Sequence, residues 1–204
     1  GNSSVAKGGQ EAVIIKGKTR TNGGSLADYL LSEGRYKKNK EKNERIEVWE
    51  ANGLEHGDRL KDILADFEHS AAGTQCEKPL FHVQIRTAEG EHLTKAQFFE
   101  TVNRLEERLD LAGHERVIVA HTLDGQDHVH VVWNRIDPEQ HKAAELHYFK
   151  NKCTDLAREL EKEFGLRELS ADRKRGKLSR DEEQQAIRHG QKPQEIKKTI
   201  RACW

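Results

Sequence analysis

The stretch His121-Thr-Leu-Asp-Gly-Gln-Asp-His-Val-His-Val-Val-Trp-Asn134 decides the fold. Side chains two apart on a β-strand point to the same face. One face of a strand over 128–134 therefore carries His128, His130, Val132 and Asn134, and the other carries Val129, Val131 and Trp133. We expect the valine and tryptophan face to pack on the core. The β-branched run at 116–120 and the Asp124-Gly125 pair predict that this strand closes a hairpin.

Such a hairpin brings three histidines together. If residues 122–127 form its loop, His121 lies directly opposite His128, where cross-strand Cβ atoms are roughly 4.5–5.5 Å apart. Three neutral imidazoles are a typical ligand set for a catalytic divalent ion that keeps open coordination positions. Such an ion can polarise a phosphate. Asp124 or Asp127 is a candidate to orient one ring through its second nitrogen. The structural alternative is a set of surface histidines without a metal.

The spacing of apolar residues outside the hairpin predicts an α+β fold. We expect strands at 12–15, 45–49 and 79–86, a Gly-rich loop at 16–24, a short helix capped by Ser25, and helices at 58–71, from Thr94 to Gly113, and around 153–164. This order predicts a mostly antiparallel sheet covered by helices on one side. Its other face would then be free for a substrate.

Composition sets limits on the kind of protein. The chain has 204 residues with 35 basic and 35 acidic side chains, so it lacks the basic surplus of many nucleic-acid-binding proteins. Binding to DNA would need a local basic groove, for which the run from Arg35 to Arg45 is a candidate; a solvated loop is the alternative. Three separate cysteines without a CxxC pair predict a reducing cytoplasm. The sequence contains no apolar run of about 18 residues, so a membrane span is not expected.

Three segments together resemble a known family. The pattern H-x6-H-x-H followed by V-V-x-N resembles motif III of conjugative relaxases in the HUH nuclease superfamily, in the branch called MOB-P. Residues 23–34, GGSLADYLLSEG, resemble motif I, which carries a nucleophilic tyrosine on a short helix, here Tyr29. Residues 81–94, FHVQIRTAEGEHLT, resemble the second motif. The family usually has a serine near Arg86, where this sequence differs. The resemblance spans residues 12–168.

The resemblance implies a two-layer HUH fold and a metal-dependent, strand-specific DNA-nicking transesterase. Its substrate would be single-stranded origin-of-transfer DNA, cleaved through a 5′-phosphotyrosine intermediate during mobilisation of a conjugative plasmid or element. The implied ion is Mg or Mn, with Zn, Ni or Co as alternatives, held by His121, His128 and His130. The residues expected to support the site are Asp124, Asp127 and Asn134. The candidate DNA contacts are Arg35, Lys37 and Lys38 of the basic run and Arg86 of the second motif.

The same resemblance implies partners and boundaries. The partners would be relaxosome accessory proteins and a type IV secretion coupling protein, in a bacterial cytoplasm, with transfer to the recipient and no membrane insertion. We expect a disordered lead or expression remnant at 1–11, a relaxase nuclease domain at 12–169, and a charged helical extension at 170–204, truncated from a longer protein.

Several alternatives stay open at this point. A replication initiator or transposase could use the same metal and tyrosine chemistry, and a non-catalytic nucleic-acid-binding module could hold a structural metal or none. Tyr36 is the alternative nucleophile if motif I is misassigned, and Tyr29 could simply pack on the sheet. Glu44 and Glu47 are not expected to serve as the base, because acidic residues in so charged a sequence are mostly solvated.

Overall fold

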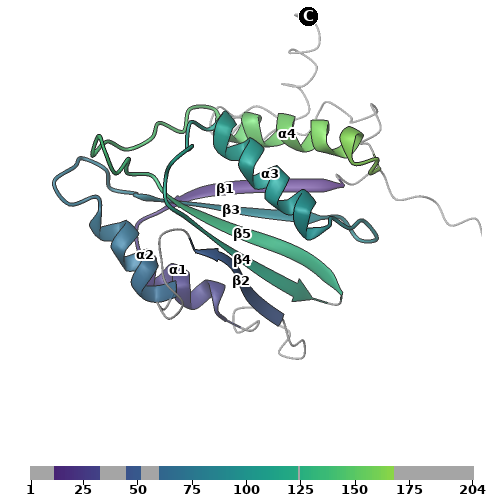
Figure 1. The fold of residues 1–204 in the computed structure, drawn as a ribbon, viewed down its shortest axis with the longest axis horizontal. Helices are drawn as coiled ribbons and strands as arrows, with labels where there is room; N and C mark the ends of the chain where they lie inside the picture. Colours follow the sequence, from purple (N-terminus) through teal and green to yellow (C-terminus); the bar gives the residue numbers. More distant parts are fainter. Residues whose placement is uncertain (1–11, 33–44, 52–59, 124, 168–204) are drawn as a thin grey trace, which may run out of the picture. The chain divides into compact units, whose positions relative to one another are not determined.

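The computed structural model describes residues 12–32, 45–51, 60–123 and 125–167 (Figure 1). The chain divides into two units, residues 1–168 and 169–204. The second unit lies outside the described residues, as do the predicted lead at 1–11 and the predicted helical extension at 170–204. Among the described residues, no helix is long and apolar enough to cross a membrane.

A five-stranded sheet in the order β1-β3-β5-β4-β2 forms the centre of the first unit (Figure 1). Every neighbouring pair is antiparallel. The strands are β1 (Val13–Arg20), β2 (Arg45–Ala51), β3 (Leu80–Thr87), β4 (Arg116–Leu123) and β5 (Gln126–Asn134). Together with four helices, this sheet confirms the predicted α+β class and the predicted antiparallel arrangement.

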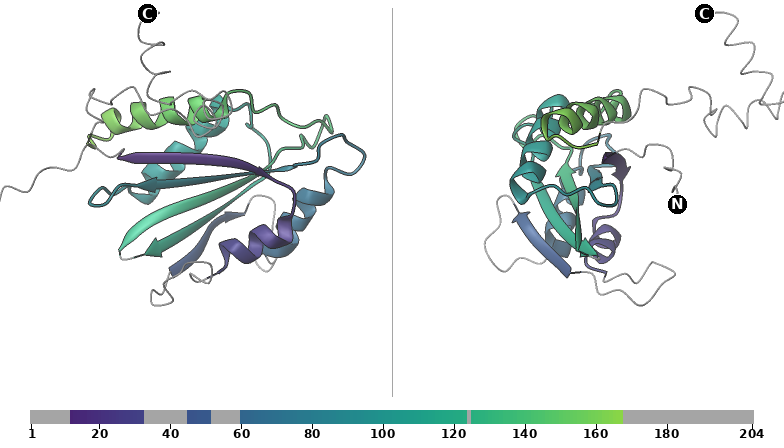
Figure 2. Two further views of the ribbon diagram at one scale, coloured as in Figure 1. Left: turned by 180° about the vertical axis from the view of Figure 1, so that it is seen from behind. Right: turned by 90° about the vertical axis from the view of Figure 1, so that its right-hand side faces the viewer.

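The helices α3 (Lys95–Arg108) and α4 (Phe149–Glu163) form a layer over one face of the sheet (Figure 2). Their apolar side chains share a core with the valine and tryptophan face of β5, as the alternation predicts. The site-bearing histidines lie on the opposite face, because they alternate with these residues along β4 and β5.

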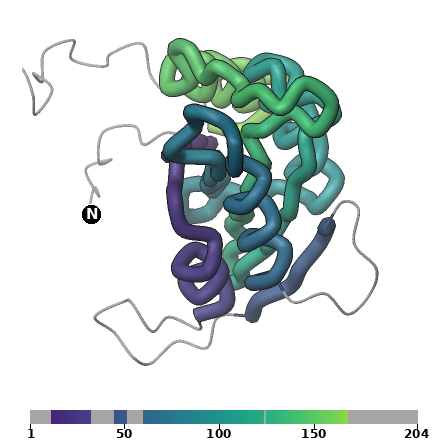
Figure 3. The backbone as a smooth tube through the Cα atoms, turned by 90° about the vertical axis from the view of Figure 1, so that its left-hand side faces the viewer, coloured from purple at the N-terminus to yellow at the C-terminus, as the bar shows by residue number. Residues whose placement is uncertain are grey.

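The histidine face is partly covered as well. The helices α1 (Gly23–Leu30) and α2 (Leu60–His69) lie side by side (Figure 3) and form a second core with Leu80, Val117 and Val132. The expectation of helices on one side only, with a free second face, is therefore wrong. Leucines of α1 and α2 bury the apolar end of this face and leave the polar end, which carries the histidines.

Two boundaries differ from the sequence prediction at the start of the chain. β1 continues through the expected loop to Arg20, because residues 16–20 pair in register with residues 84–80 of β3. Pairing of the backbone thus overrides the turn propensity of Gly17 and Thr19. The N-cap of α1 is Asn22 and not Ser25, since the Asn22 Oδ1 accepts the Ser25 N–H at 2.6 Å.

The remaining boundaries follow the prediction more closely. Thr94 caps α3 as expected, in a capping box with Gln97. The helix ends at Arg108, earlier than the predicted stop, and Gly113 closes a later turn with a φ of 84°. The strand at 79–86, the strand at 45–49 and the helix at 58–71 are confirmed, with bounds that differ by one or two residues.

Candidate active site

The β4–β5 hairpin places His121 directly opposite His128, as predicted. Pairing continues beyond them to Leu123 and Gln126, so the connection is shorter than the predicted loop at 122–127. The longer ladder fixes the register of the histidines on both strands. A one-residue slip would move them to the opposite face.

His121, His128 and His130 form a compact group. One ring nitrogen from each lies within 4.8 Å of the others, and the ring centroids are 4.7 to 5.3 Å apart. His121 and His130 are buried, whereas His128 is half-buried. This geometry can hold a metal ion that stays accessible from the side of His128.

Two of these rings are oriented by hydrogen bonds at their other nitrogen. His121 Nε2 lies 2.8 Å from the Leu30 carbonyl oxygen at the end of α1, to which it can only donate. His130 Nδ1 lies 2.9 Å from His82 Nε2. Each ring therefore keeps one nitrogen for an ion. Such outer contacts are typical of metal-binding histidines, because they fix both the tautomer and the orientation of the ring.

His82 is a functional candidate that the sequence analysis missed. It is 7% exposed and its ring stacks on His130 with centroids 5.1 Å apart. Burial, with smaller contributions from the charges of Arg20 and His121, lowers the pKa of His82 from 6.5 to about 4. The ring is thus neutral near neutral pH and can accept the Nδ1 proton of His130. A signal was present, because His82, Gln84 and Arg86 alternate with apolar residues on β3.

Tyr29 lies against the same histidines. Its ring makes edge contacts with His82 and His130, at centroid distances of 6.0 and 5.8 Å. The side chain is 39% exposed and belongs to neither apolar cluster. The structure therefore brings together the predicted nucleophile and the predicted metal ligands, which are 92 residues apart between Tyr29 and His121.

Both ends of the helix that carries Tyr29 are fixed. At its start, the Gly23 N–H donates to Glu68 Oε2 of α2 at 2.7 Å. At its end, the Leu30 carbonyl accepts from His121. A side chain on a helix held at both ends has a defined position relative to the imidazoles.

The other predicted site residues are distributed as follows. Arg86 pairs in register with His128 and is exposed on the histidine face. Asp127 accepts a hydrogen bond from the Thr122 hydroxyl at 2.6 Å, across the hairpin. Asp124, Arg35, Lys37 and Lys38 lie outside the described residues, as do Tyr36 and Glu44.

Asn134 and Glu47 are not brought to the histidine group. Asn134 is buried and lies six residues from His128 along β5, a separation of roughly 20 Å. Its side chain forms hydrogen bonds with Ser70, Glu115 and the backbone of Ile136. Glu47 accepts from Trp49 Nε1 at 3.2 Å and pairs with Ala120, whose side chain belongs to the α3 side of the sheet. Glu47 thus lies on the face opposite the histidines, in keeping with the expectation that it is not the base.

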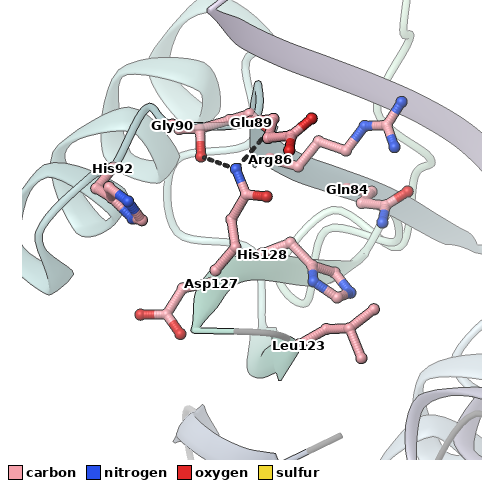
Figure 4. A pocket seen from close by; sticks show the side chains of 10 residues that line it. Gln84, Arg86, Glu89, Gly90, His92, Leu123, Asp127 and His128 are labelled. Carbon is pink, nitrogen blue, oxygen red and sulfur yellow. Dashed lines mark hydrogen bonds between the residues drawn. The ribbon is translucent and has the colours of Figure 1, made fainter. Parts of the chain in front are cut away.

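A cavity of about 530 Å³ opens beside His128 (Figure 4). Its lining offers one cation, two carboxylates, two amides and a further imidazole, from Arg86, Asp127, Glu89, Gln84, Gln126 and His92. Gln126 Nε2 donates to the Ala88 carbonyl at 2.6 Å and so ties the loop after β3 to the hairpin. The cavity is therefore polar and lies next to the most exposed member of the histidine group.

Comparison with models of known protein families gives a match. A family model described as the nuclease domain of MobA/VirD2-like relaxases matches residues 29–166. The match includes Tyr29, the three histidines and all four β-strands that follow α1. No curated protein matches the chain.

Proposed function

Because the chain belongs to the MobA/VirD2-like relaxase nuclease family, we propose that it nicks one strand of origin-of-transfer DNA by attack of Tyr29 on a phosphodiester. The observation that carries the proposal is the contact of the Tyr29 ring with His130 of the histidine group and with His82 behind it. The family match favours a relaxase over a replication initiator or transposase. Relaxosome accessory proteins and a secretion coupling protein are the partners that this role would require.

The donor set fits a divalent ion. His121, His128 and His130 would hold it, and when bound it would neutralise charge on the phosphate oxygens. Magnesium prefers oxygen ligands, whereas imidazole suits the transition metals. Of the ions expected from the sequence, three nitrogen donors therefore favour Mn, Co, Ni or Zn over Mg.

The proposed reaction is a transesterification without water or a redox step. A phenol has a pKa of about 10, so the Tyr29 hydroxyl must give up its proton as it attacks. The bond between Tyr29 Oη and phosphorus forms, and the bond between phosphorus and the 3′-oxygen breaks. The 3′-oxygen takes up one proton, which balances the one lost by the phenol. The phosphotyrosine keeps the ester bond, so the reverse reaction can rejoin the strand.

The chain's own residues supply alignment. The contacts at both ends of α1 hold Tyr29 beside the histidines, and alignment of this kind lowers the barrier because less freedom is lost on reaction. The cavity beside His128 would take a nucleotide next to the cleaved phosphate, with Arg86 as a phosphate contact. The DNA would then lie across the polar end of the sheet.

The test is covalent capture. The protein is incubated with Mn²⁺ and a pool of single-stranded DNA of randomised sequence, and SDS-resistant adducts are isolated and sequenced. We expect a defined cleavage site and a tryptic peptide that carries DNA on Tyr29. Tyr29→Phe should bind DNA and metal but form no adduct, whereas Tyr148→Phe, at a 79% exposed tyrosine outside the site, should behave as wild type.

Other outcomes would change the proposal. An adduct on Tyr36 would transfer the role to that residue, and cleavage without an adduct would mean that water is the nucleophile. If Tyr29→Phe changes nothing and wild type forms no adduct, the chain is a binding module. In titration calorimetry, Ala at His121, His128 or His130 should weaken Mn²⁺ binding, while His147→Ala, at an exposed histidine, should not.

A further inference from the structure

Three basic side chains follow the edge strand β1 on the histidine face. Lys16, Lys18 and Arg20 alternate along the strand, so they point to one side. Lys18 pairs in register with His82, which fixes that side as the histidine face. We call Lys16, Lys18 and Arg20 the β1 basic strip. Both lysines are exposed, and neither forms an ion pair with any residue that the structure describes.

Arg20 has an unusual environment. It is partly buried, and its Nε is fully buried without a hydrogen-bond partner. Within the described part of the chain, the side chain of Arg20 makes no hydrogen bond or ion pair. Among the residues that the structure describes, two other arginines have a buried Nε without a hydrogen-bond partner, but Arg135 donates to the Lys78 and Ala144 carbonyls and Arg158 pairs with Glu161. The guanidinium of Arg20 therefore has no acceptor among the described residues.

The space next to Arg20 is a cavity that it shares with the nucleophile. This cavity has a volume of about 310 Å³ and is lined by Arg20, Tyr29 and the first turn of α1. The Tyr29 ring also contacts His130, with ring centroids 5.8 Å apart. An anion in this cavity would therefore lie beside the Arg20 guanidinium and beside a tyrosine that contacts the histidine group.

We propose that Arg20 binds the phosphate that Tyr29 attacks, and that Lys18 and Lys16 bind phosphates further along the same strand. The proposal rests on the proposed function and adds the path of the DNA. A guanidinium presents two parallel N–H donors that match two phosphate oxygens, and it stays charged throughout the reaction. Arg20 would stabilise the negative charge of the transition state. A donor that is already oriented before the reaction gives the largest stabilisation of this kind.

The basic side chains proposed to bind DNA lie at a different place in the chain from those expected from the sequence. The basic run predicted from Arg35 to Arg45 lies outside the described residues except for Arg45, which pairs with Glu47, whereas the β1 basic strip was part of a predicted loop. Its three side chains come to one face only because residues 16–20 continue the strand. Successive side chains on that face are about 6.6 Å apart, so the strip spans about 13 Å leading to Tyr29.

The experiment compares Arg20→Gln and Arg20→Lys with Lys150→Gln, which removes an equal charge from an exposed position on α4. Binding of a fluorescent thirty-nucleotide oligothymidylate is measured in EDTA over a range of salt concentrations. Arg20→Gln should lower the slope of log affinity against log salt by about 0.7, the value for one phosphate contact on a single strand. Arg20→Lys should keep the slope, and Lys150→Gln should leave it unchanged.

The second readout is adduct formation with Mn²⁺ and the oligonucleotide recovered by covalent capture. Arg20→Gln should slow the reaction about 100-fold, as loss of one oriented donor does elsewhere. Arg20→Lys should slow it less, because the charge remains but the paired donors are lost. Mn²⁺ affinity should be unchanged in both variants, which separates Arg20 from the metal ligands.

The outcomes are distinguishable. If wild type forms the adduct and Arg20→Gln matches it in both rate and salt slope, the proposal is overturned while the proposed function stands. If wild type forms no adduct, the proposed function fails, and an unchanged salt slope in Arg20→Gln would overturn this proposal independently. If Arg20→Gln does not fold, as judged by its thermal melt, Arg20→Lys decides: a wild-type rate of adduct formation would overturn the phosphate role.

Discussion

Gly23 controls how closely α1, the helix of the proposed nucleophile Tyr29, approaches α2. A Cβ at this position would lie 2.1 Å from the Leu64 carbonyl oxygen of α2 and 2.5 Å from its carbonyl carbon. The neighbouring atoms are backbone, so no side-chain rotation can make room. Gly23→Ala must therefore move α1 away from α2.

The size of this movement can be worked out from the structure. The Cβ contact must grow from 2.1 to at least 3.0 Å, so α1 shifts by about 0.9 Å. A misplacement of about 1 Å can cost about 100-fold in rate. The strain should also cost about 1 to 3 kcal/mol of stability, more than the gain of about 0.5 to 1 kcal/mol that alanine gives over glycine in a helix.

Gly24 provides a matched control in the same turn. A Cβ there would meet its nearest atoms at 3.6 Å, an ordinary contact. We expect Gly24→Ala to be neutral or slightly stabilising and to nick DNA at the wild-type rate. Gly23→Ala should melt earlier and form the Tyr29 adduct about 10 to 100 times more slowly, with Mn²⁺ affinity nearly retained. If both variants nick DNA equally fast, the position of α1 does not limit the reaction and the reasoning fails.

Further predictions concern stability in EDTA. The pKa of His82 is about 4 in the folded chain and 6.5 when unfolded, so the unfolded state binds a proton first as pH falls. The free energy of unfolding should therefore drop by up to about 3 kcal/mol between pH 6.5 and 4. His82→Gln should flatten this pH dependence, as measured by urea titrations. Glu161 is 1% exposed and accepts hydrogen bonds from the N–H groups of Ala12 and Val13 at 2.8 and 3.0 Å, so it anchors the start of β1. Glu161→Ala should lower the free energy of unfolding by about 3 to 5 kcal/mol, whereas Glu159→Ala, at a more exposed position, should lower it by less than about 1 kcal/mol. Equal losses in the two variants would refute the anchoring role of Glu161.

Much of the fold could be predicted because local signals agree with the final packing. The alternation in β5 gave the correct core face, and Thr94 with Gln97 gave the start of α3. The prediction of secondary structure was wrong where pairing with a distant strand determines the local conformation. Residues 16–20 carry turn formers and lysines, and only the ladder with β3 makes them a strand.

The candidate site shows the same limit. The histidine group was predictable because all three histidines lie on one hairpin, whose register follows from its own sequence. His82 and Arg20 were not predictable, because their relation to that hairpin depends on the order of β1, β3 and β5 in the sheet. A polar residue on an otherwise apolar strand is a visible signal, but its neighbours across the sheet are not.

The placement of α1 links the fold to the chemistry. Buried polar groups cost stability unless they are hydrogen-bonded, and His121 meets this need by donating to the Leu30 carbonyl, next to Tyr29. The same bond therefore orients a ring of the histidine group and fixes the end of the helix that carries Tyr29. Leucines of α1 and α2 bury the apolar end of the face, so the helix cannot slide toward the polar end without exposing them. The distance between Tyr29 and the histidine group is thus set by apolar packing on one side and by the hydrogen bond of His121 on the other.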